Sequence, residues 1–136
     1  MLPDGFDGDN ADRSCDECDR RGWEMKGKTT VDLFRSGNSA SPRMERVRPG
    51  RDAIIRVRKG AEWVEGRRIG VSTSASITNL QGGTWWCLPA GSEYRDDILF
   101  VVNDHHDHYA WQPERDMTLM EFKEALATLN RNFLLV

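Results

Sequence analysis

Short segments that alternate between apolar and polar residues recur along most of the chain. Residues 30–35 alternate and carry β-branched or aromatic side chains at the apolar positions, and residues 53–58 form a second such segment. Trp63-Val64 and residues 69–72 flank the sequence Glu65-Gly66-Arg67-Arg68, which has the composition of a hairpin turn. Because side chains alternate between the two faces of a strand, this pattern predicts strands with one face against a core.

The second half of the chain continues this pattern. Strands are expected at residues 84–88, 98–102 and 109–111, each bounded by Gly, Pro, Asn or Asp. The apolar end of the chain, residues 133–136, is expected to pair as an edge strand or to dock on a partner. A mostly β domain follows from these segments.

One helix is predicted near the carboxyl end. Apolar residues recur there at intervals of three and four positions, the spacing of one helical face: Leu119, Phe122, Ala125, Leu126 and Leu129. Thr118 and Glu121 have the spacing of a capping box, so the helix is expected to begin at Thr118.

Residues 1–28 differ from the rest of the chain. They are rich in Asp and Gly and show neither the helical nor the strand periodicity, so we interpret them as an acidic, loosely ordered amino-terminal arm. Residues 29–136 are then expected to form one domain, a size that one hydrophobic core can serve.

Composition narrows the class of protein. The chain has 136 residues, of which 38% are apolar and 30% charged, and no apolar run approaches the roughly 20 residues that span a bilayer. The amino terminus lacks the basic start and apolar stretch of a secretory signal, so we expect a cytoplasmic protein, with export by a signal-independent machine left open. Three cysteines with one close pair favour a reducing compartment.

Charge is unevenly distributed, although the net charge is only -3. Acidic residues are concentrated in the arm. Nine basic residues are concentrated in the middle of the chain: Arg43, Arg46, Arg48, Arg51, Arg56, Arg58, Lys59, Arg67 and Arg68. A phosphate-bearing ligand is therefore expected to favour the middle segment, whereas overall attraction to nucleic acid or anionic lipid is not expected.

Three segments together resemble the strand elements of ADP-ribosyltransferases of the arginine, serine, glutamate type. They are residues 31–35 ending in Arg35, the run Gly70-Val71-Ser72-Thr73-Ser74, and residues 108–113 beginning with His108-Tyr109. Downstream, residues 82–91 with two adjacent tryptophans and the Met-led helix are similar to small ADP-ribosyltransferase toxins delivered by type VI secretion. The resemblance covers residues 31–130.

The resemblance implies an α+β fold with a split antiparallel β-core and a carboxyl-terminal helix, together with NAD-dependent transfer of ADP-ribose or NAD hydrolysis. Arg35 would clamp the NAD phosphates, for which a guanidinium offers a rigid fork of donors. Ser72, Thr73 and Ser74 would line the nicotinamide side through hydroxyls, and His108 would orient the ribose. The catalytic candidates are thus Arg35, Ser72 and His108.

Two aromatic residues, Trp85 and Tyr109, are further candidates for stacking on the cofactor, since pockets commonly have aromatic walls. A toxin of this kind also implies a cognate immunity protein as its partner. The competing interpretation of Arg35 is an ordinary strand-end arginine in solvent.

The third element departs from the family pattern. Where the family carries Glu-x-Glu or Gln-x-Glu, this chain reads Asp107-His108-Tyr109. A histidine by itself does not offset a developing positive charge as a carboxylate does. Asp107 is the nearest carboxylate in this interpretation, with Glu93 and Glu114 as fallback candidates.

The alternative function is a non-catalytic, zinc-stabilised binding module for nucleic acid or protein. Cys15 and Cys18 have the spacing of half a zinc site, which a histidine of residues 105–108 would have to complete. Strict alternation would place only His106 and His108 of that histidine-rich run on one face, so we expect a solvated loop there and no metal.

Overall fold

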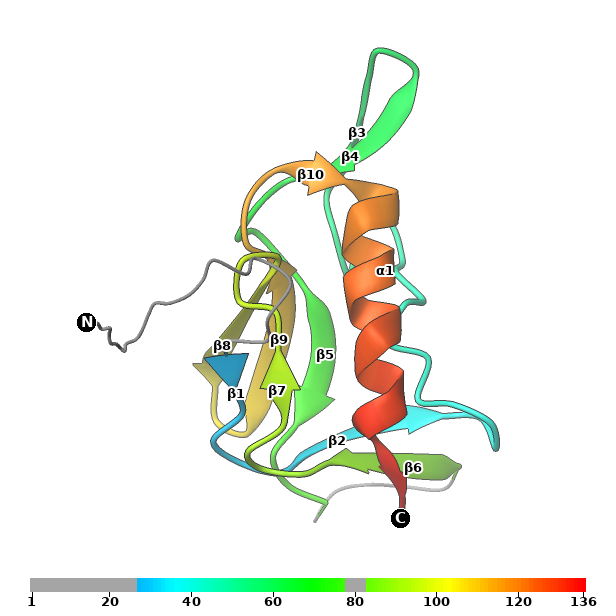
Figure 1. Cartoon of the computed structure of the whole chain (residues 1–136), viewed down its shortest axis with the longest axis vertical. Helices are drawn as coiled ribbons and strands as arrows, with labels where there is room; N and C mark the ends of the chain where they lie inside the picture. The colour runs from blue at the N-terminus through cyan, green and yellow to red at the C-terminus, as the bar shows by residue number, and fades with distance from the viewer. Residues whose placement is uncertain (1–26, 78–82) are drawn as a thin grey trace, which may run out of the picture.

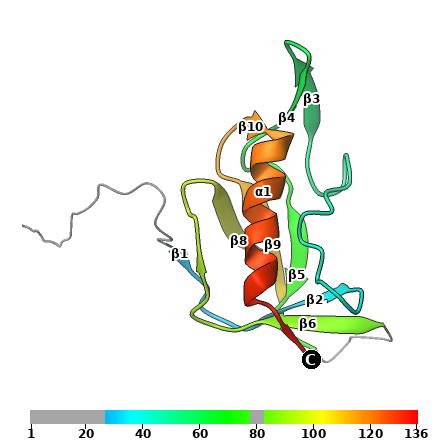
Figure 2. The same ribbon diagram turned by 45° about the vertical axis from the view of Figure 1, so that its right-hand side comes forward.

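The computed structural model describes residues 27–77 and 83–136, and its largest element is a six-stranded antiparallel sheet. Its strands, in spatial order, are β11 (Leu134–Leu135), β6 (Thr84–Leu88), β2 (Leu33–Gly37), β5 (Val71–Ser74), β9 (His108–Pro113) and β8 (Leu99–His105). β2 and β6 run across the direction of β5, β9 and β8, so the sheet is strongly twisted (Figures 1 and 2).

A long hairpin projects from one end of the molecule (Figure 2). Its strands are β3 (Ile55–Arg58) and β4 (Ala61–Val64), and β4 also pairs with β10 (Met117–Thr118). Lys59 and Gly60 form the turn with positive φ angles of 50° and 79°, a conformation that glycine adopts freely. The expected hairpin turn at residues 65–68 was therefore wrong, because β4 pairs with β3 and β10 rather than with β5.

A second small sheet lies near the start of the described chain. β1 (Gly27–Lys28) pairs with β7 (Glu93–Tyr94), so regular structure is present two residues before the expected start of the domain. The rest of the acidic arm lies outside the described residues.

The helix α1 (Leu119–Leu129) begins where the sequence predicts. Thr118 is its N-cap, and the Thr118 hydroxyl accepts a hydrogen bond of 3.1 Å from the Glu121 backbone N–H. A 3₁₀ turn, η1 (Asn130–Asn132), follows, and β11 then pairs with β6 as an edge strand, one of the two expected fates of the apolar end. No helix in the described ranges is long and apolar enough to cross a membrane.

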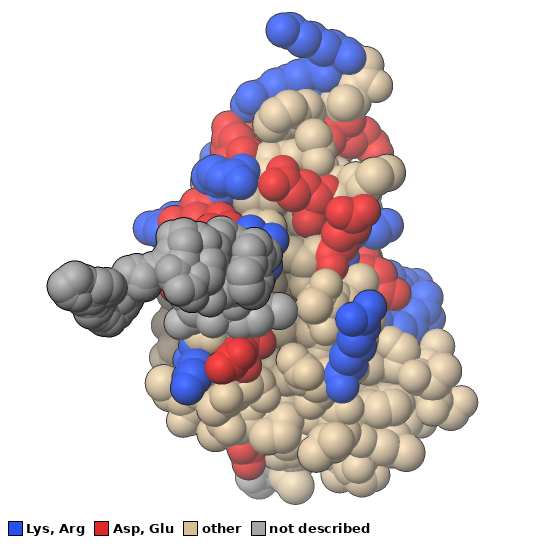
Figure 3. Space-filling view, in the orientation of Figure 1, with Lys and Arg blue, Asp and Glu red and all other residues tan. Residues whose placement is uncertain are grey.

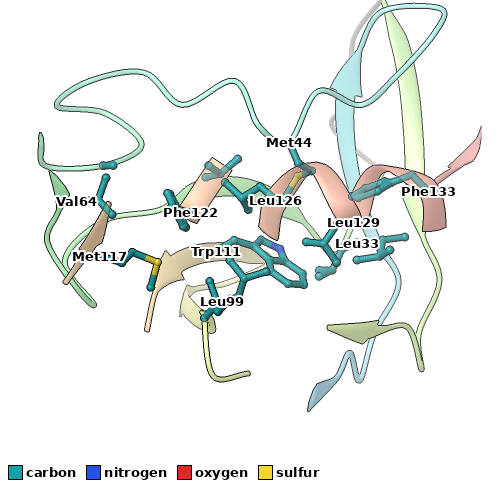
Figure 4. Close-up of a cluster of buried hydrophobic side chains, with 14 residues drawn as sticks. Leu33, Met44, Val64, Leu99, Trp111, Met117, Phe122, Leu126, Leu129 and Phe133 are labelled. Carbon is teal, nitrogen blue, oxygen red and sulfur yellow. The ribbon is translucent and has the colours of Figure 1, made fainter. Parts of the chain in front are cut away.

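α1 packs against one face of the main sheet and forms the hydrophobic core with it (Figure 4). Phe122, Leu126 and Leu129 are the buried residues of the helix. They pack with buried side chains of the strands: Leu33, Val71, Leu88, Leu99 and Trp111. We call this side of the sheet the core face and the opposite side the outer face. The expected α+β architecture, antiparallel strands with one carboxyl-terminal helix, is confirmed.

Strand register assigns the polar residues of β5 to the two faces. Val71 is opposite Trp111 on the core face, and Thr73 therefore also faces the core, where it is 3% exposed. Ser72 and Ser74 alternate with them and lie on the outer face, where Ser74 pairs with His108. The fold thus separates the three hydroxyl residues of β5 into one core position and two outer positions.

Charged side chains do not gather in one basic patch on the face drawn in Figure 3. Acidic side chains follow α1, and basic side chains cover the far end of the β3–β4 hairpin. The basic middle of the sequence is thus divided between the hairpin and the loop after β2.

Truncation of the helix core tests this packing. Phe122 is fully buried between α1 and the sheet, so Phe122→Ala should lower the free energy of unfolding by about 3–5 kcal/mol. Met120 is 70% exposed on the same helix, and Met120→Ala should change it by less than about 0.5 kcal/mol. Chemical denaturation of both variants measures the difference, and equal losses would contradict the assigned helix face.

Candidate active site

The main sheet loses regular pairing between β2 and β5. β2 pairs with β6 along all five of its residues, but with β5 only through Phe34 and Ser74. Beyond that pair the two strands no longer exchange regular backbone hydrogen bonds, so polar main-chain groups at this junction need other partners. Arg35, the next residue of β2, supplies one.

The Arg35 guanidinium joins three segments of the chain. Its Nη1 donates to the backbone oxygen of Ser72 on β5 at 2.9 Å. Its Nε and Nη2 donate to the backbone oxygens of Pro42 at 3.0 Å and Arg43 at 3.3 Å. Arg35 is therefore not a strand-end arginine in solvent, because three of its five N–H groups hold carbonyl oxygens and only the other two could serve a ligand.

Burial lowers the pKa of the Arg35 guanidinium, and the nearby Asp52 carboxylate opposes that shift. An arginine keeps its charge across the physiological range all the same, since its ordinary pKa is far above neutrality. The junction of β2 and β5 thus carries a fixed, half-buried positive charge.

A pocket of about 350 Å³ opens beside this charge. Its lining contains no acidic side chain and consists of Arg35, Ser36, Gly37, Asn38, Pro42, Arg43, Arg46 and Arg48. Arg48 is partly neutralised, since its Nε lies 2.9 Å from a carboxylate oxygen of the buried Asp52. The pocket is suited to an anion, and phosphate matches its guanidinium donors.

On the outer face, three side chains form a hydrogen-bonded chain. His108 Nε2 lies 2.9 Å from the Ser72 hydroxyl, and His108 Nδ1 lies 2.5 Å from Asp104 Oδ1. A carboxylate only accepts, so Nδ1 is the donor to Asp104, and when the ring is neutral Nε2 accepts from the Ser72 O–H. Ser72 is thus held at its carbonyl by Arg35 and at its hydroxyl by His108.

A β-bulge explains why Asp104 reaches His108. β8 and β9 pair regularly up to Asn103 and Tyr109, and the register then shifts so that His105 is opposite His108. Asp104 is the extra residue, and a bulge places two residues opposite one on the neighbouring strand. The turn is held by the Asn103 amide, which donates to the backbone oxygens of His106 at 2.8 Å and His108 at 3.2 Å.

The pKa of the Asp104 carboxyl lies below its usual range. Partial burial opposes this shift, but the hydrogen bond from His108 and the nearby His108 and His105 rings outweigh it. Asp104 is consequently a carboxylate at neutral pH, and it gives the His108 ring a negatively charged partner.

The other candidate hydroxyls have different partners. The Thr73 hydroxyl donates to the Tyr109 backbone oxygen at 3.0 Å and accepts from the Trp111 indole N–H at 3.2 Å. Ser74 forms a local turn, with its hydroxyl bonded to the backbone of Ser76 at the end of β5. Of the run 72–74, only the Ser72 hydroxyl contacts His108.

The two candidate aromatic residues lie on opposite faces of the sheet. Tyr109 is opposite Thr73 and packs against the core. Trp85 lies on β6 opposite Ser36, which by alternation is the outer face, two strands away from Ser72. Trp85 shares a face with the Ser72 hydroxyl, whereas Tyr109 does not.

The alternative carboxylates lie away from the hydrogen-bonded chain. Glu93 is on β7 opposite Lys28, and Glu114 accepts from Arg67 at 2.5 Å. Asp107 occupies the turn between β8 and β9, where its backbone oxygen accepts from Ala75. Asp104, four positions before His108, is the functional carboxylate candidate that sequence reasoning missed.

The cysteines fall into two groups. Burial, followed by the charge of Asp32, raises the pKa of the Cys87 thiol, so this thiol stays protonated at neutral pH in the metal-free chain. Cys15 and Cys18 lie outside the described residues.

Comparison with known proteins gives one family. A family model described as Tse2 ADP-ribosyltransferase toxin matches residues 24–134, which is most of the chain. No curated protein and no solved structure matches the chain.

Removal of the Arg35 side chain should destabilise the fold as well as alter the pocket. Arg35→Ala leaves three backbone oxygens without their donor, and hydrogen bonds from a charged group contribute about 1.5–3 kcal/mol, so we expect a loss of at least about 2 kcal/mol in the free energy of unfolding. Arg46 lines the same pocket but is exposed, so Arg46→Ala should cost less than about 0.5 kcal/mol. Urea titrations of both variants measure these losses in the free energy of unfolding. An unchanged midpoint for Arg35→Ala would contradict its structural role.

The placement of Thr73 yields a second test. Thr73→Val keeps the shape of the side chain but leaves the buried Trp111 N–H without an acceptor, which should cost about 1–3 kcal/mol. Because Thr73 faces the core, the variant should retain its affinity for nucleotide ligands. A large loss of affinity with intact stability would contradict this placement and indicate that Thr73 is part of the binding site.

Proposed function

The chain belongs to the Tse2 ADP-ribosyltransferase toxin family and is therefore an ADP-ribosyltransferase toxin, and from this we propose that it consumes NAD, by ADP-ribosyl transfer or by NAD hydrolysis. We further propose that it acts in the cytoplasm of a target bacterium, where NAD and macromolecular acceptors are available, after delivery by a type VI secretion machine. A cognate immunity protein would protect the producing cell.

The observation that carries this proposal is the double hold on Ser72. Its backbone oxygen accepts from Arg35 and its hydroxyl donates to His108, so three candidates from three separate strands meet at one residue. Side chains held by fixed partners can offer a preorganised polar surface to a ligand. Such a surface is the main requirement of electrostatic catalysis.

The reaction needs charge of both signs. NAD carries a dianionic pyrophosphate, and its bond between nicotinamide and ribose breaks through a state with oxocarbenium character. We assign the pyrophosphate to the arginine-lined pocket beside Arg35, in which Arg43 and Arg46 supply further guanidinium groups. Arg35 then has two functions, since it holds the main chain with three N–H groups and offers the remaining two to phosphate.

Asp104 supplies the negative charge that a histidine alone lacks. Its carboxylate accepts from His108 Nδ1, which orients the ring and stabilises positive charge near Nε2. We propose that His108, with Asp104 behind it, stands where the related enzymes carry the last glutamate, and that it orients Ser72 and the ribose. Bond cleavage releases nicotinamide, and the ribose carbon passes to an acceptor nucleophile or to water.

Nicotinamide release by the purified full-length chain tests this function. His108→Ala should lower kcat by at least about 100-fold and change KM by less than about 3-fold, because its effect is assigned to the transition state. His106→Ala is the matched control from the same turn and should keep the activity. Dependence of the release on added lysate separates transfer to a macromolecule from hydrolysis.

Release that persists unchanged in His108→Ala would remove this ring from the mechanism. If the unmodified chain released no nicotinamide with or without lysate, the binding-module alternative would gain support. Zinc bound by Cys15 and Cys18 would then be the next measurement.

A further inference from the structure

The bulge that delivers Asp104 to His108 also brings a second histidine to the same carboxylate. His105 Nδ1 lies 3.2 Å from Asp104 Oδ1, and His108 Nδ1 lies 2.5 Å from that same oxygen. The two imidazole rings are stacked, with centroids 5.0 Å apart and planes inclined by 24°. Two ring nitrogens and one carboxylate oxygen therefore converge on one point.

We propose that Asp104, His105 and His108 form a binding site for a divalent transition-metal ion of the zinc type. Imidazole nitrogen and carboxylate oxygen are the donors that such ions accept, and three protein ligands leave a fourth position for water. The three ligand atoms all lie within 4.8 Å of one another.

The two oxygen-to-nitrogen distances fit an ion after a small opening of the cluster. Ligands about 2.0–2.2 Å from a tetrahedral zinc ion are about 3.3 Å apart, and the oxygen-to-nitrogen distance of 3.2 Å between Asp104 and His105 is already close to this. The pair Asp104–His108 must widen by less than 1 Å. The side chains of Asp104 and His105 are 42% and 66% exposed, so both can move into solvent as the cluster opens.

Metal binding at this site would reverse a hydrogen bond at Ser72. Without metal, Asp104 keeps the ring proton of His108 on Nδ1, and Nε2 accepts from the Ser72 O–H. A metal ion binds the lone pair of Nδ1, so the proton on Nδ1 is released. Nε2 takes up a proton from solvent, and the ring stays neutral. Nε2 then donates, and the Ser72 hydroxyl has to accept instead.

This consequence for turnover rests on the proposed function. Zinc should inhibit nicotinamide release, because the His108–Ser72 bond acquires the wrong direction. His105 contacts Asp104 and His108 but neither Ser72 nor the arginine-lined pocket, and Asp104 retains its hydrogen bond from His108 without it. His105→Ala should therefore keep most of the basal activity and lose the inhibition.

Titration of the full chain with Zn²⁺ by calorimetry tests the site directly. Cys15→Ser and Cys18→Ser are introduced in every sample, which removes the two thiols as competing ligands. In this background His105→Ala should bind zinc at least about tenfold more weakly, whereas His106→Ala, the adjacent histidine outside the cluster, should bind as the parent does. Equal affinity of the parent and His105→Ala, or no binding by the parent, would overturn the proposed site.

Two-bond ¹H–¹⁵N correlation spectra of the imidazole rings provide a readout that does not depend on activity. Addition of zinc should move the His108 proton from Nδ1 to Nε2 in the parent and leave it on Nδ1 in His105→Ala. A His108 ring that keeps its proton on Nδ1 in the zinc-bound parent would overturn the coupling to Ser72. If no form of the chain consumed NAD, the proposed function would fail, while calorimetry and spectra would still decide on the metal site.

Discussion

The Arg35 guanidinium holds together the part of the fold where the main sheet has no regular ladder. β2 and β5 share a single pair, and beyond it the Ser72 carbonyl is satisfied by Arg35 rather than by a strand neighbour. The same side chain fixes the loop after β2 through the carbonyls of Pro42 and Arg43. A partly buried carbonyl without a donor is costly, so this arginine stabilises the local break in the sheet.

The break and the candidate site are two aspects of one arrangement. An unbroken ladder would use the polar edges of β2 and β5 for each other, and it would leave no half-buried positive charge beside the arginine-lined pocket. Under the proposed function Arg35 links stability with ligand binding, and its removal should affect both. A substitution that lowers activity at this position does not by itself distinguish the two functions, for which Arg46 in the same pocket serves as the comparison.

On the other side of β5, one inserted residue determines which side chains surround His108. Regular pairing of β8 and β9 would have placed a single residue opposite His108, whereas the bulge places both Asp104 and His105 there. Asp104 fixes the proton on the ring, and the ring fixes the Ser72 hydroxyl. The chain thereby obtains a carboxylate-supported polar group near Ser72 although it lacks the late glutamate pair of the family pattern.

Local periodicity and a family resemblance in the sequence were enough to predict the helix with its Thr118 cap, most strands and the α+β class, and the resemblance named Arg35, Ser72 and His108 as candidates. These depend on short-range alternation, capping chemistry and a resemblance carried by a few residues. The tertiary structure alone decided that β4 pairs with β3 and β10, that Thr73 faces the core, and that Asp104 rather than Asp107 supports His108. Register and bulges depend on which strand lies alongside, and the alternation within one strand carries no information about its neighbour.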